Sequence, residues 1–280
     1  MRATLERLVR LALDEDVGTG DATTDWTIPE EAMGVADVLS KGSAVLAGLD
    51  AFTLTYEMVD PEVEVEPHEP DGASVEPGDV VLSVSGSARA LLTGERVALN
   101  FLGRLSGVAT ATRAYVRAVE GTGARVIDTR KTTPGFRRLE KAAVVAGGGT
   151  NHRMGLYDMV LVKDNHIAAS GGIEAAVEAV RSRNLRGLPV EVEVTDMEQL
   201  EAALRAVVDR VLLDNMTPGQ VAQAVARVRA SDGPRPQLEA SGNMSLDRIR
   251  SYADAGVDFI SVGAMTHSAP AADFSMRFRS

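Results

Sequence analysis

The chain has 280 residues, 45% of them hydrophobic, which is enough for one large α/β domain and a smaller one. Its formal net charge of −11 argues against nucleic acid as a partner, because phosphate contact needs a broad basic surface. With no cysteine and only four histidines, disulfides, a thiolate nucleophile and Cys-based metal sites are excluded, and a His-based zinc site is disfavoured. No apolar run approaches membrane-spanning length and no signal-peptide pattern is present, so we expect a soluble cytoplasmic protein with no membrane partner.

The first third of the sequence predicts a β-rich module over residues 20–87. Its predicted elements, with the helix that precedes them, are helices over 3–15 and 49–58, a strand pair within 34–48 turning at Lys41 and Gly42, and strands near 62–66 and 80–84. The turn-rich segment 18–24 is either a polar connector or a loop at the edge of a site. A long helix is expected from Ala88, interrupted at Gly107 before a second helical segment over 108–119.

From Ala124 onward, short β-branched runs alternate with helical patterns. The predicted strands are 125–128, 159–163, 190–194, 211–214, 237–240 and 259–262, and the predicted helices are 136–146, 172–183, 196–208, 217–230 and 245–255. Buried strands separated by helices are typical of a parallel β/α system, and six of them favour a barrel over an open sheet. Their irregular spacing suggests that the barrel is incomplete.

Two features predict a functional rim on this barrel. Residues 128–166 hold seven Lys or Arg against four Asp or Glu, a net +3 within a chain of −11. Polar or small residues also end each predicted strand, and in a parallel barrel all of these ends lie on the rim where active sites are built. They are Asp128, Thr129, Arg130 and Lys131; Lys163, Asp164, Asn165 and His166; Glu193; Asp214 and Asn215; Glu239, Ser241, Gly242 and Asn243; and Ser261 and Gly263.

These residue types suit a phosphorylated, anionic substrate. The cations Arg130, Lys131, Arg153 and Lys163 match carboxylates and phosphates, and His152 could donate a further hydrogen bond. The segments 241–243 and 261–263 offer backbone N–H groups that could cradle a phosphate. Glu193 and Asp214 suit a hard cation such as Mg²⁺. Together, the three groups indicate phosphoribosyl chemistry.

Other enzyme classes fit less well. The glycines at 147–149 are not followed by the Lys of a P-loop, and Gly121 and Gly123 lack the strand-turn-helix context of a dinucleotide fingerprint. No Gly-x-Ser-x-Gly elbow of a serine hydrolase is present. A Schiff base on Lys163 stays open as a minor alternative, but anion-binding groups surround this lysine and nothing obvious desolvates it.

Six ordered motifs of the chain closely resemble the quinolinate phosphoribosyltransferase family, the decarboxylating nicotinate-nucleotide pyrophosphorylases. The motifs are DTRKTTPG at 128–135, GGGTNHRMGL at 147–156, VKDNH at 162–166, LDN at 213–215, EASG at 239–242 and SVGAMTH at 261–267, with EDVGTGD at 15–21 and TGERVALN at 93–100 also similar. The resemblance implies an N-terminal α/β sandwich over 1–108 and a C-terminal incomplete α/β barrel over 109–267. The tail 268–280 is expected to pack on the sandwich. The resemblance also implies at least a dimer, in which Arg96 reaches the partner subunit's site.

The resemblance further implies the site residues and the reaction. Phosphoribosyl pyrophosphate would react with quinolinate to give nicotinate mononucleotide, pyrophosphate and CO₂ in de novo NAD biosynthesis, with Lys163, Arg130, Glu193 and Asp214 as catalytic residues. Glu193 and Asp214 would also hold Mg²⁺. The implied substrate-binding residues are Arg96, Thr129, Arg130, Lys131, His152, Arg153, Lys163, Ser241, Gly242, Asn243, Ser261, Val262, Gly263 and His267. Asn243 departs from the family, many members of which have a second glycine there.

Two other functions stay open at this point. A paralogue associated with molybdenum transport shares the DTRK motif and would act on a different acid, although the intact Asn151, His152, Arg153 and Arg96 favour quinolinate. The protein could also be a catalytically silent binder of phosphorylated metabolites, which the nearly complete set of motifs disfavours.

Overall fold

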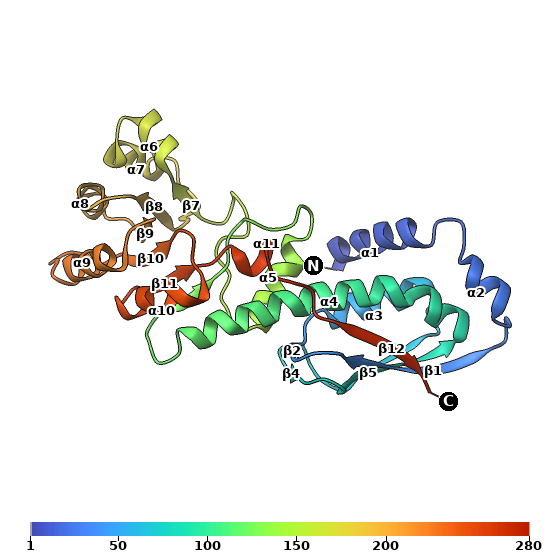
Figure 1. The fold of residues 1–280 in the computed structure, drawn as a ribbon. Helices are drawn as coiled ribbons and strands as arrows, with labels where there is room; N and C mark the ends of the chain where they lie inside the picture. The colour runs from blue at the N-terminus through green and yellow to red at the C-terminus, as the bar shows by residue number, and fades with distance from the viewer. Residues whose placement is uncertain (1, 280) are drawn as a thin grey trace. The chain divides into compact units, whose positions relative to one another are not determined.

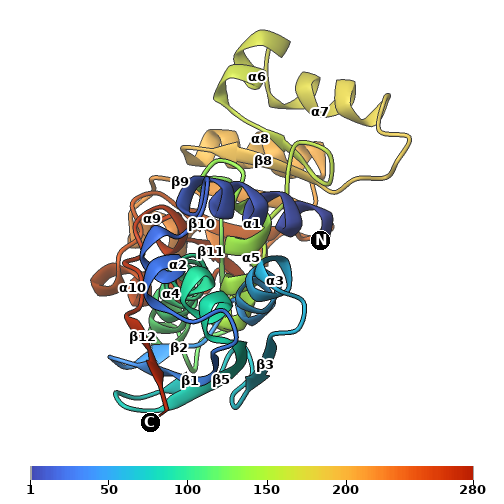
Figure 2. The ribbon, with the colours of Figure 1, turned by 90° about the vertical axis from the view of Figure 1, so that its right-hand side faces the viewer.

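The computed structural model of the protein describes residues 2–279. The chain divides into two compact units, the first comprising the described residues of Met1–Arg113, Thr132–Gly148 and Ser268–Ser280, and the second comprising Ala114–Lys131 and Gly149–His267. Figures 1 and 2 label the elements of each unit. Every helix within residues 2–279 is too short or too polar to cross a membrane.

The first unit contains a four-stranded antiparallel sheet in the order β12-β1-β5-β3 (Figure 2). Its strands are β1 (Met33–Ser40), β3 (Glu64–Pro67), β5 (Val80–Ser87) and β12 (Phe274–Phe278). β1 is central, pairing with β5 from Met33 opposite Ser87 and with β12 from Ala36 opposite Phe278. The described part of the tail 268–280 therefore contributes a strand to the N-terminal sheet.

Helices pack against this sheet through one apolar cluster. The helices of the first unit are α1 (Arg2–Asp16), α2 (Ala22–Thr27), α3 (Leu49–Val59), most of α4 (Ala88–Ala118) and α5 (Arg137–Ala146). Phe52 and Tyr56 of α3 and Leu91 of α4 are fully buried in the same cluster as Val38 and Leu82 of the sheet. Helices on an antiparallel sheet form the predicted α/β sandwich.

Three local predictions for this unit are wrong. The proposed loop 18–24 ends in α2, because the Asp21 side chain accepts a hydrogen bond from Thr24 N at 3.0 Å and caps a helix there. Within 34–48, β1 does not pair with β2 (Ala44–Val45), since both edges of β1 are taken and β2 pairs with β4 (Ser74–Val75). Gly107 does not interrupt α4, which is continuous; a Cβ there would overlap the carbonyl oxygen of Pro270.

The second unit is a six-stranded, all-parallel sheet in the order β6-β11-β10-β9-β8-β7. Its strands are β6 (Arg125–Ile127), β7 (Val160–Val162), β8 (Val190–Val194), β9 (Arg210–Asp214), β10 (Gln237–Ser241) and β11 (Phe259–Ser261). The helices of this unit after β7 are α6 (Asp164–Ser170), α7 (Ile173–Arg181), α8 (Met197–Ala206), α9 (Pro218–Arg229), α10 (Leu246–Asp254) and, after the last strand, α11 (Ala264–His267). All six predicted strands are present. β6 and β7 are the two edges of the sheet and do not pair with each other, which confirms an incomplete barrel.

Candidate active site

A cavity of about 690 Å³ lies at the carboxyl ends of the parallel strands. Its walls come from all six strand ends of the second unit, as the rim prediction requires. The predicted site residues that line it are Thr129, Arg130, Lys131, His152, Arg153, Lys163, Glu193, Asp214, Ser241, Gly242, Asn243, Ser261, Gly263 and His267. The fold thus gathers into one cavity fourteen residues that are spread over nearly half of the sequence.

Two predicted residues do not line this cavity. Val262 is fully buried and its N–H donates to the carbonyl oxygen of Ile127 at 2.9 Å, so that N–H is not offered to a phosphate. Arg96 is an exposed residue of α4 in the first unit. The cation-rich segment also divides, because Arg138 and Lys141 lie on α5 and not at the cavity.

The loop after β6 is attached to the segment that follows β11. Thr266 Oγ1 donates to the carbonyl oxygen of Lys131 at 2.7 Å, and Lys131 N donates to Thr129 Oγ1 at 3.0 Å. Gly263 lies where a Cβ would come within 3.3 Å of the Lys131 side chain and within 3.2 Å of the His267 ring. The absence of a side chain at residue 263 lets Lys131 and His267 meet at one wall of the cavity.

The ends of β9 and β10 form a tight turn pair beside the cavity. Asn215 Nδ2 donates to Asp214 Oδ2 at 2.7 Å, and a Cβ at Gly242 would overlap the Asn215 side chain. Gly242 has φ +113°, which favours glycine, and Asn243 has φ +43°. Asparagine tolerates the left-handed region better than most residues, so the turn accommodates Asn243.

Two guanidinium groups are held near each other at the cavity. Burial lowers the pKa of Arg153, and the positive charge of Arg130 lowers it further, while the negative charges of Glu191 and Asp158 partly compensate. Arg153 Nη1 also donates to the carbonyl oxygen of Met159 at 3.2 Å, which anchors its side chain. Two like charges repel each other in a partly buried site, and an anion bound between them relieves this repulsion. The arrangement therefore favours binding of an anion.

Lys163 lies at the junction of β7 and α6 and pairs with a predicted metal ligand. Its Nζ is 3.1 Å from Glu193 Oε2, and the two side chains are 46% and 15% exposed. His166 Nδ1 accepts the Lys163 N–H at 3.0 Å and so fixes the start of α6. The exposure of Lys163 and its carboxylate partner both disfavour the Schiff-base alternative, which needs a desolvated amine.

A charged cluster lies inside the barrel, and the sequence analysis named His152 and Glu239 but neither Glu191 nor Arg210 of it. His152 Nε2 is 3.0 Å from Glu191 Oε2 and 3.4 Å from Glu239 Oε2, and Arg210 Nη1 is 3.3 Å from the same Glu239 oxygen. Both carboxylates are fully buried. The strand VEVEV at 190–194 carried a signal for Glu191, since the period of two places it on the same face as Glu193.

Burial and charge shift the pKa values of this cluster. Burial raises the pKa of Glu191, and the charge of Glu239 adds to it, giving about 7. Burial lowers the pKa of His152, but the nearby carboxylates of Glu191 and Glu239 outweigh it and raise the value to about 9. The Arg153 N–H, 2.6 Å from His152 Nδ1, opposes this rise because it favours an unprotonated Nδ1. Nε2 therefore carries a hydrogen, directed at the carboxylates, in either state of the ring.

Two sets of carboxylates could hold a cation. The first set is His152, Glu191 and Glu239, whose ligand atoms all lie within 4.8 Å of one another. Within residues 2–279 it is the one group of three or more His, Asp or Glu side chains that lie this close together. Arg210 already brings positive charge to that group. Glu193 and Asp214 instead open on the cavity itself, where a substrate could complete the coordination of a hard cation.

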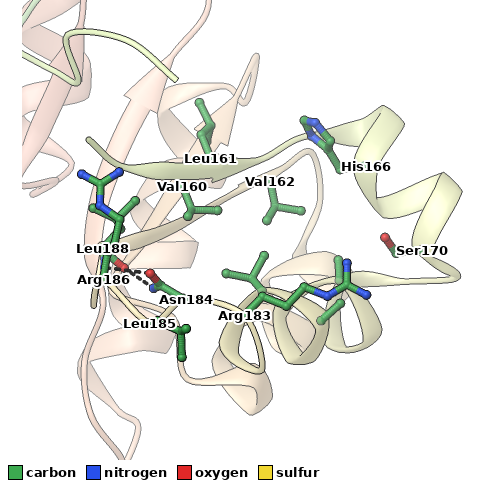
Figure 3. Close-up of a pocket in the computed structure, with 13 residues that line it drawn as sticks. Val160, Leu161, Val162, His166, Ser170, Arg183, Asn184, Leu185, Arg186 and Leu188 are labelled. Atoms are coloured by element: carbon green, nitrogen blue, oxygen red, sulfur yellow. Dashed lines mark hydrogen bonds between the residues drawn. The ribbon is translucent and has the colours of Figure 1, made fainter. Parts of the chain in front are cut away.

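A second cavity of about 680 Å³ lies beside β7, α6 and α7 (Figure 3). Its walls are mainly apolar and include Val160, Val162 and Leu188. His166, which lies in the cation-rich segment, lines this cavity and not the one at the strand ends. The proximity of His166 to Lys163 in sequence does not bring its side chain into the polar site.

The fold and the polar cavity define a parallel α/β-barrel enzyme with a cationic substrate site at the carboxyl ends of its strands. Two family models match the chain: "Quinolinate phosphoribosyl transferase, N-terminal domain" over residues 21–106 and "Quinolinate phosphoribosyl transferase, C-terminal domain" over residues 108–277. The chain belongs to the quinolinate phosphoribosyltransferase family.

Relatives and solved structures agree over nearly the whole chain. The nicotinate-nucleotide pyrophosphorylase [carboxylating] of Mycobacterium leprae is 43% identical, with 96% of this chain and 95% of that protein covered. A probable enzyme of the same name from Bacillus subtilis is 40% identical, with 97% and 92% covered. The structure of the nicotinate-nucleotide pyrophosphorylase from Francisella tularensis superimposes with a TM-score of 0.95 at 37% identity, covering 100% of this chain and 97% of that one.

Proposed function

We propose that this chain is a decarboxylating quinolinate phosphoribosyltransferase, a pentosyltransferase of de novo NAD biosynthesis that works in the cytoplasm. It converts quinolinate and phosphoribosyl pyrophosphate to nicotinate mononucleotide, pyrophosphate and CO₂. The observation that carries the proposal is the pair Arg130 and Arg153, whose like charges share one cavity wall. A dicarboxylate bound between them would relieve their repulsion, and planar guanidinium groups suit carboxylates.

The residues around this pair suit the rest of the reaction. Lys131 and His267 meet beside Gly263, where they can bind phosphate or pyrophosphate oxygens as the bond at the anomeric carbon breaks. The pyridine nitrogen of quinolinate attacks that carbon, and the nitrogen becomes positively charged. When the 2-carboxylate leaves as CO₂, the electron pair of the broken bond stays on ring carbon 2, where the adjacent positive nitrogen stabilises it, and that carbon then takes a proton from water. No strong protein nucleophile is required, so positioning and electrostatics supply the catalysis.

Glu193 and Asp214 fit Mg²⁺, because hard carboxylate oxygens on a cavity with room for a phosphorylated substrate are the ligands this ion uses. The ion, when bound, would neutralise charge on pyrophosphate. Lys163 lies against Glu193 and offers a cation to the same region of the cavity.

The proposed function is tested by adding phosphoribosyl pyrophosphate, Mg²⁺ and quinolinate to the purified protein and measuring pyrophosphate and CO₂. We expect equal amounts of both products, and none with nicotinate as the parallel acid. Turnover of nicotinate without CO₂ would move the chain to a paralogue that acts on a different acid. Binding of phosphoribosyl pyrophosphate without any release of pyrophosphate would indicate a silent binder.

Removal of divalent cations is expected to abolish turnover, because pyrophosphate is a poor leaving group without neutralisation of its charge. The measurement is activity after exhaustive chelation and dialysis, followed by addition of Mg²⁺. Glu193→Gln and Asp214→Asn should each raise the Mg²⁺ concentration needed for half-maximal activity, by about 10-fold or more. Full activity in metal-free buffer would contradict the assignment of these two carboxylates.

The protein is further proposed to act as a dimer in which Arg96 serves the partner subunit's site. Arg96→Ala and Lys163→Ala should each be inactive alone. In mixed dimers one site then holds both natural residues, so random mixing should restore about a quarter of the wild-type sites. Activity is measured after the two variants are co-expressed, with native mass spectrometry to count the mixed dimers. Mixed dimers without activity would place Arg96 in its own subunit's chemistry, and activity of Arg96→Ala alone would place it outside the chemistry.

A further inference from the structure

The interior of the barrel directly below the cavity is charged. Parallel barrels usually fill this space with branched apolar side chains. Here Glu191 of β8 and Glu239 of β10 are fully buried, each two residues before a cavity-lining residue of its strand, Glu193 and Ser241. Side chains two residues apart on a strand share a face, so the two carboxylates form the layer at the floor of the cavity, which Glu239 itself lines.

The layer is joined to the cavity wall through His152. Its Nε2 lies 3.0 Å from Glu191 Oε2 and 3.4 Å from Glu239 Oε2, and its Nδ1 accepts the N–H of Arg153 at 2.6 Å. The backbone N–H of His152 donates to the buried Asp128 Oδ1 at 2.8 Å. The imidazole is thus held at both nitrogens, and the backbone at the base of the Arg153 side chain is held with it.

Stability does not explain this layer. Replacing a buried ion pair by well-packed apolar residues is often neutral or stabilising. Both carboxylate oxygens of Glu191 and the Oε1 atom of Glu239 have no hydrogen-bond partner among the described residues, which makes burial of these carboxylates still less favourable. A buried, incompletely satisfied charged layer that touches a substrate cavity is more readily explained by function.

The electrostatics identify what the layer does. The charge of Arg130 lowers the pKa of Arg153 and so disfavours its positive form, whereas the charge of Glu191 raises the pKa and favours that form. Without a support below, two guanidinium groups at one cavity wall would move apart by rotation of their side chains or of the loop that carries Arg153.

We propose that Glu191 and Glu239 are positioning residues, which orient the His152 imidazole and hold Arg153 close to Arg130 so that the two guanidinium groups receive the carboxylates of quinolinate. The inference rests on the proposed function. Neither carboxylate touches the reacting atoms. Their contribution is a preorganised site for the dicarboxylate, and the phosphoribosyl pyrophosphate side of the cavity does not depend on them.

Glu239→Gln and Glu191→Gln test the proposal, because each preserves the volume of the side chain and removes its charge. We expect the KM for quinolinate to rise by about 10- to 100-fold, the range found when groups that orient a ligating residue are removed. The KM for phosphoribosyl pyrophosphate and kcat at saturating quinolinate should change by less than about threefold. Calorimetric titration of quinolinate should show a matching loss of affinity.

A surface carboxylate provides the matched control. Glu201 pairs with Arg227 at 2.7 Å on α8 and α9, away from the cavity, so Glu201→Gln should leave both KM values unchanged. Glu239→Leu, which also removes the hydrogen-bond acceptor, should bind quinolinate more weakly than Glu239→Gln.

If the wild-type protein turns over quinolinate, three results for the variants would overturn the inference. They are an unchanged KM for quinolinate in folded Gln variants, an equal rise in both KM values, and a fall in kcat alone. Absence of pyrophosphate and CO₂ from the wild-type protein would instead refute the proposed function. If a single Gln variant does not fold, the double variant Glu191→Gln with Glu239→Gln replaces it. In that variant both carboxylates are neutral, and the KM for quinolinate must rise while the KM for phosphoribosyl pyrophosphate does not.

Discussion

Arg130→Ala is expected to lower kcat/KM for quinolinate by about 10²-fold or more with the fold intact, because it removes one of the two guanidinium groups at the cavity wall. Arg130→Lys should recover only part of this loss, since a point charge does not reproduce a planar fork. Lys163→Ala is expected to cause a loss of similar size. Steady-state kinetics for each substrate and a thermal unfolding curve would be recorded for every variant.

Arg138 provides the control for this prediction, because it is an exposed arginine of the same cation-rich segment and does not line the cavity. Arg138→Ala should retain near-normal turnover. Normal turnover in Arg130→Ala or Lys163→Ala would contradict the roles assigned to those residues. A loss of the same size in Arg138→Ala would show that net charge, and not position in the cavity, determines activity.

Gly107→Ala is expected to destabilise the protein by roughly 2–3 kcal/mol, because its Cβ would overlap the carbonyl oxygen of Pro270 and push the C-terminal segment from α4. The loss exceeds the gain of about 1 kcal/mol that alanine brings to a helix interior. In a protein of this size the change should lower Tm by about 3–5 °C.

Gly219→Ala is the matched control for the helix, since Gly219 lies in α9 and a Cβ there meets nothing within 4 Å. That variant should be neutral or slightly stabilised. A Gly107→Ala protein as stable as the wild type would show that the segment after Ser268 moves aside at little cost.

Local patterns in the sequence were sufficient for most elements of the barrel. The predicted strands 190–194 and 211–214 correspond to β8 and β9, because short runs rich in apolar residues, interrupted in β8 by two glutamates, are typical of strands buried on both faces. The short helices α6 and α11 were missed. They have seven and four residues, too few to show a helical period.

Contacts distant in sequence decided the elements that were predicted wrongly. β1 pairs with β12, whose residues come more than 230 positions later, so the neighbouring run at 44–45 is excluded from that sheet. Gly107 is a helix glycine because the chain returns at Pro270. Neither partner can be identified from a window around the residue, because the approach depends on the whole fold.

The candidate site shows the same division. The sequence alone determined the residue types at the strand ends, the resemblance to one family and the barrel class, since each depends on order and chemistry along the chain. Only the tertiary structure decided that Val262 turns away from the cavity, that His166 lines a different one and that Glu191 and Glu239 meet His152. The physical reason is that sequence spacing gives the strand face a side chain occupies, whereas its partners are set by the strands and loops that the fold places around it.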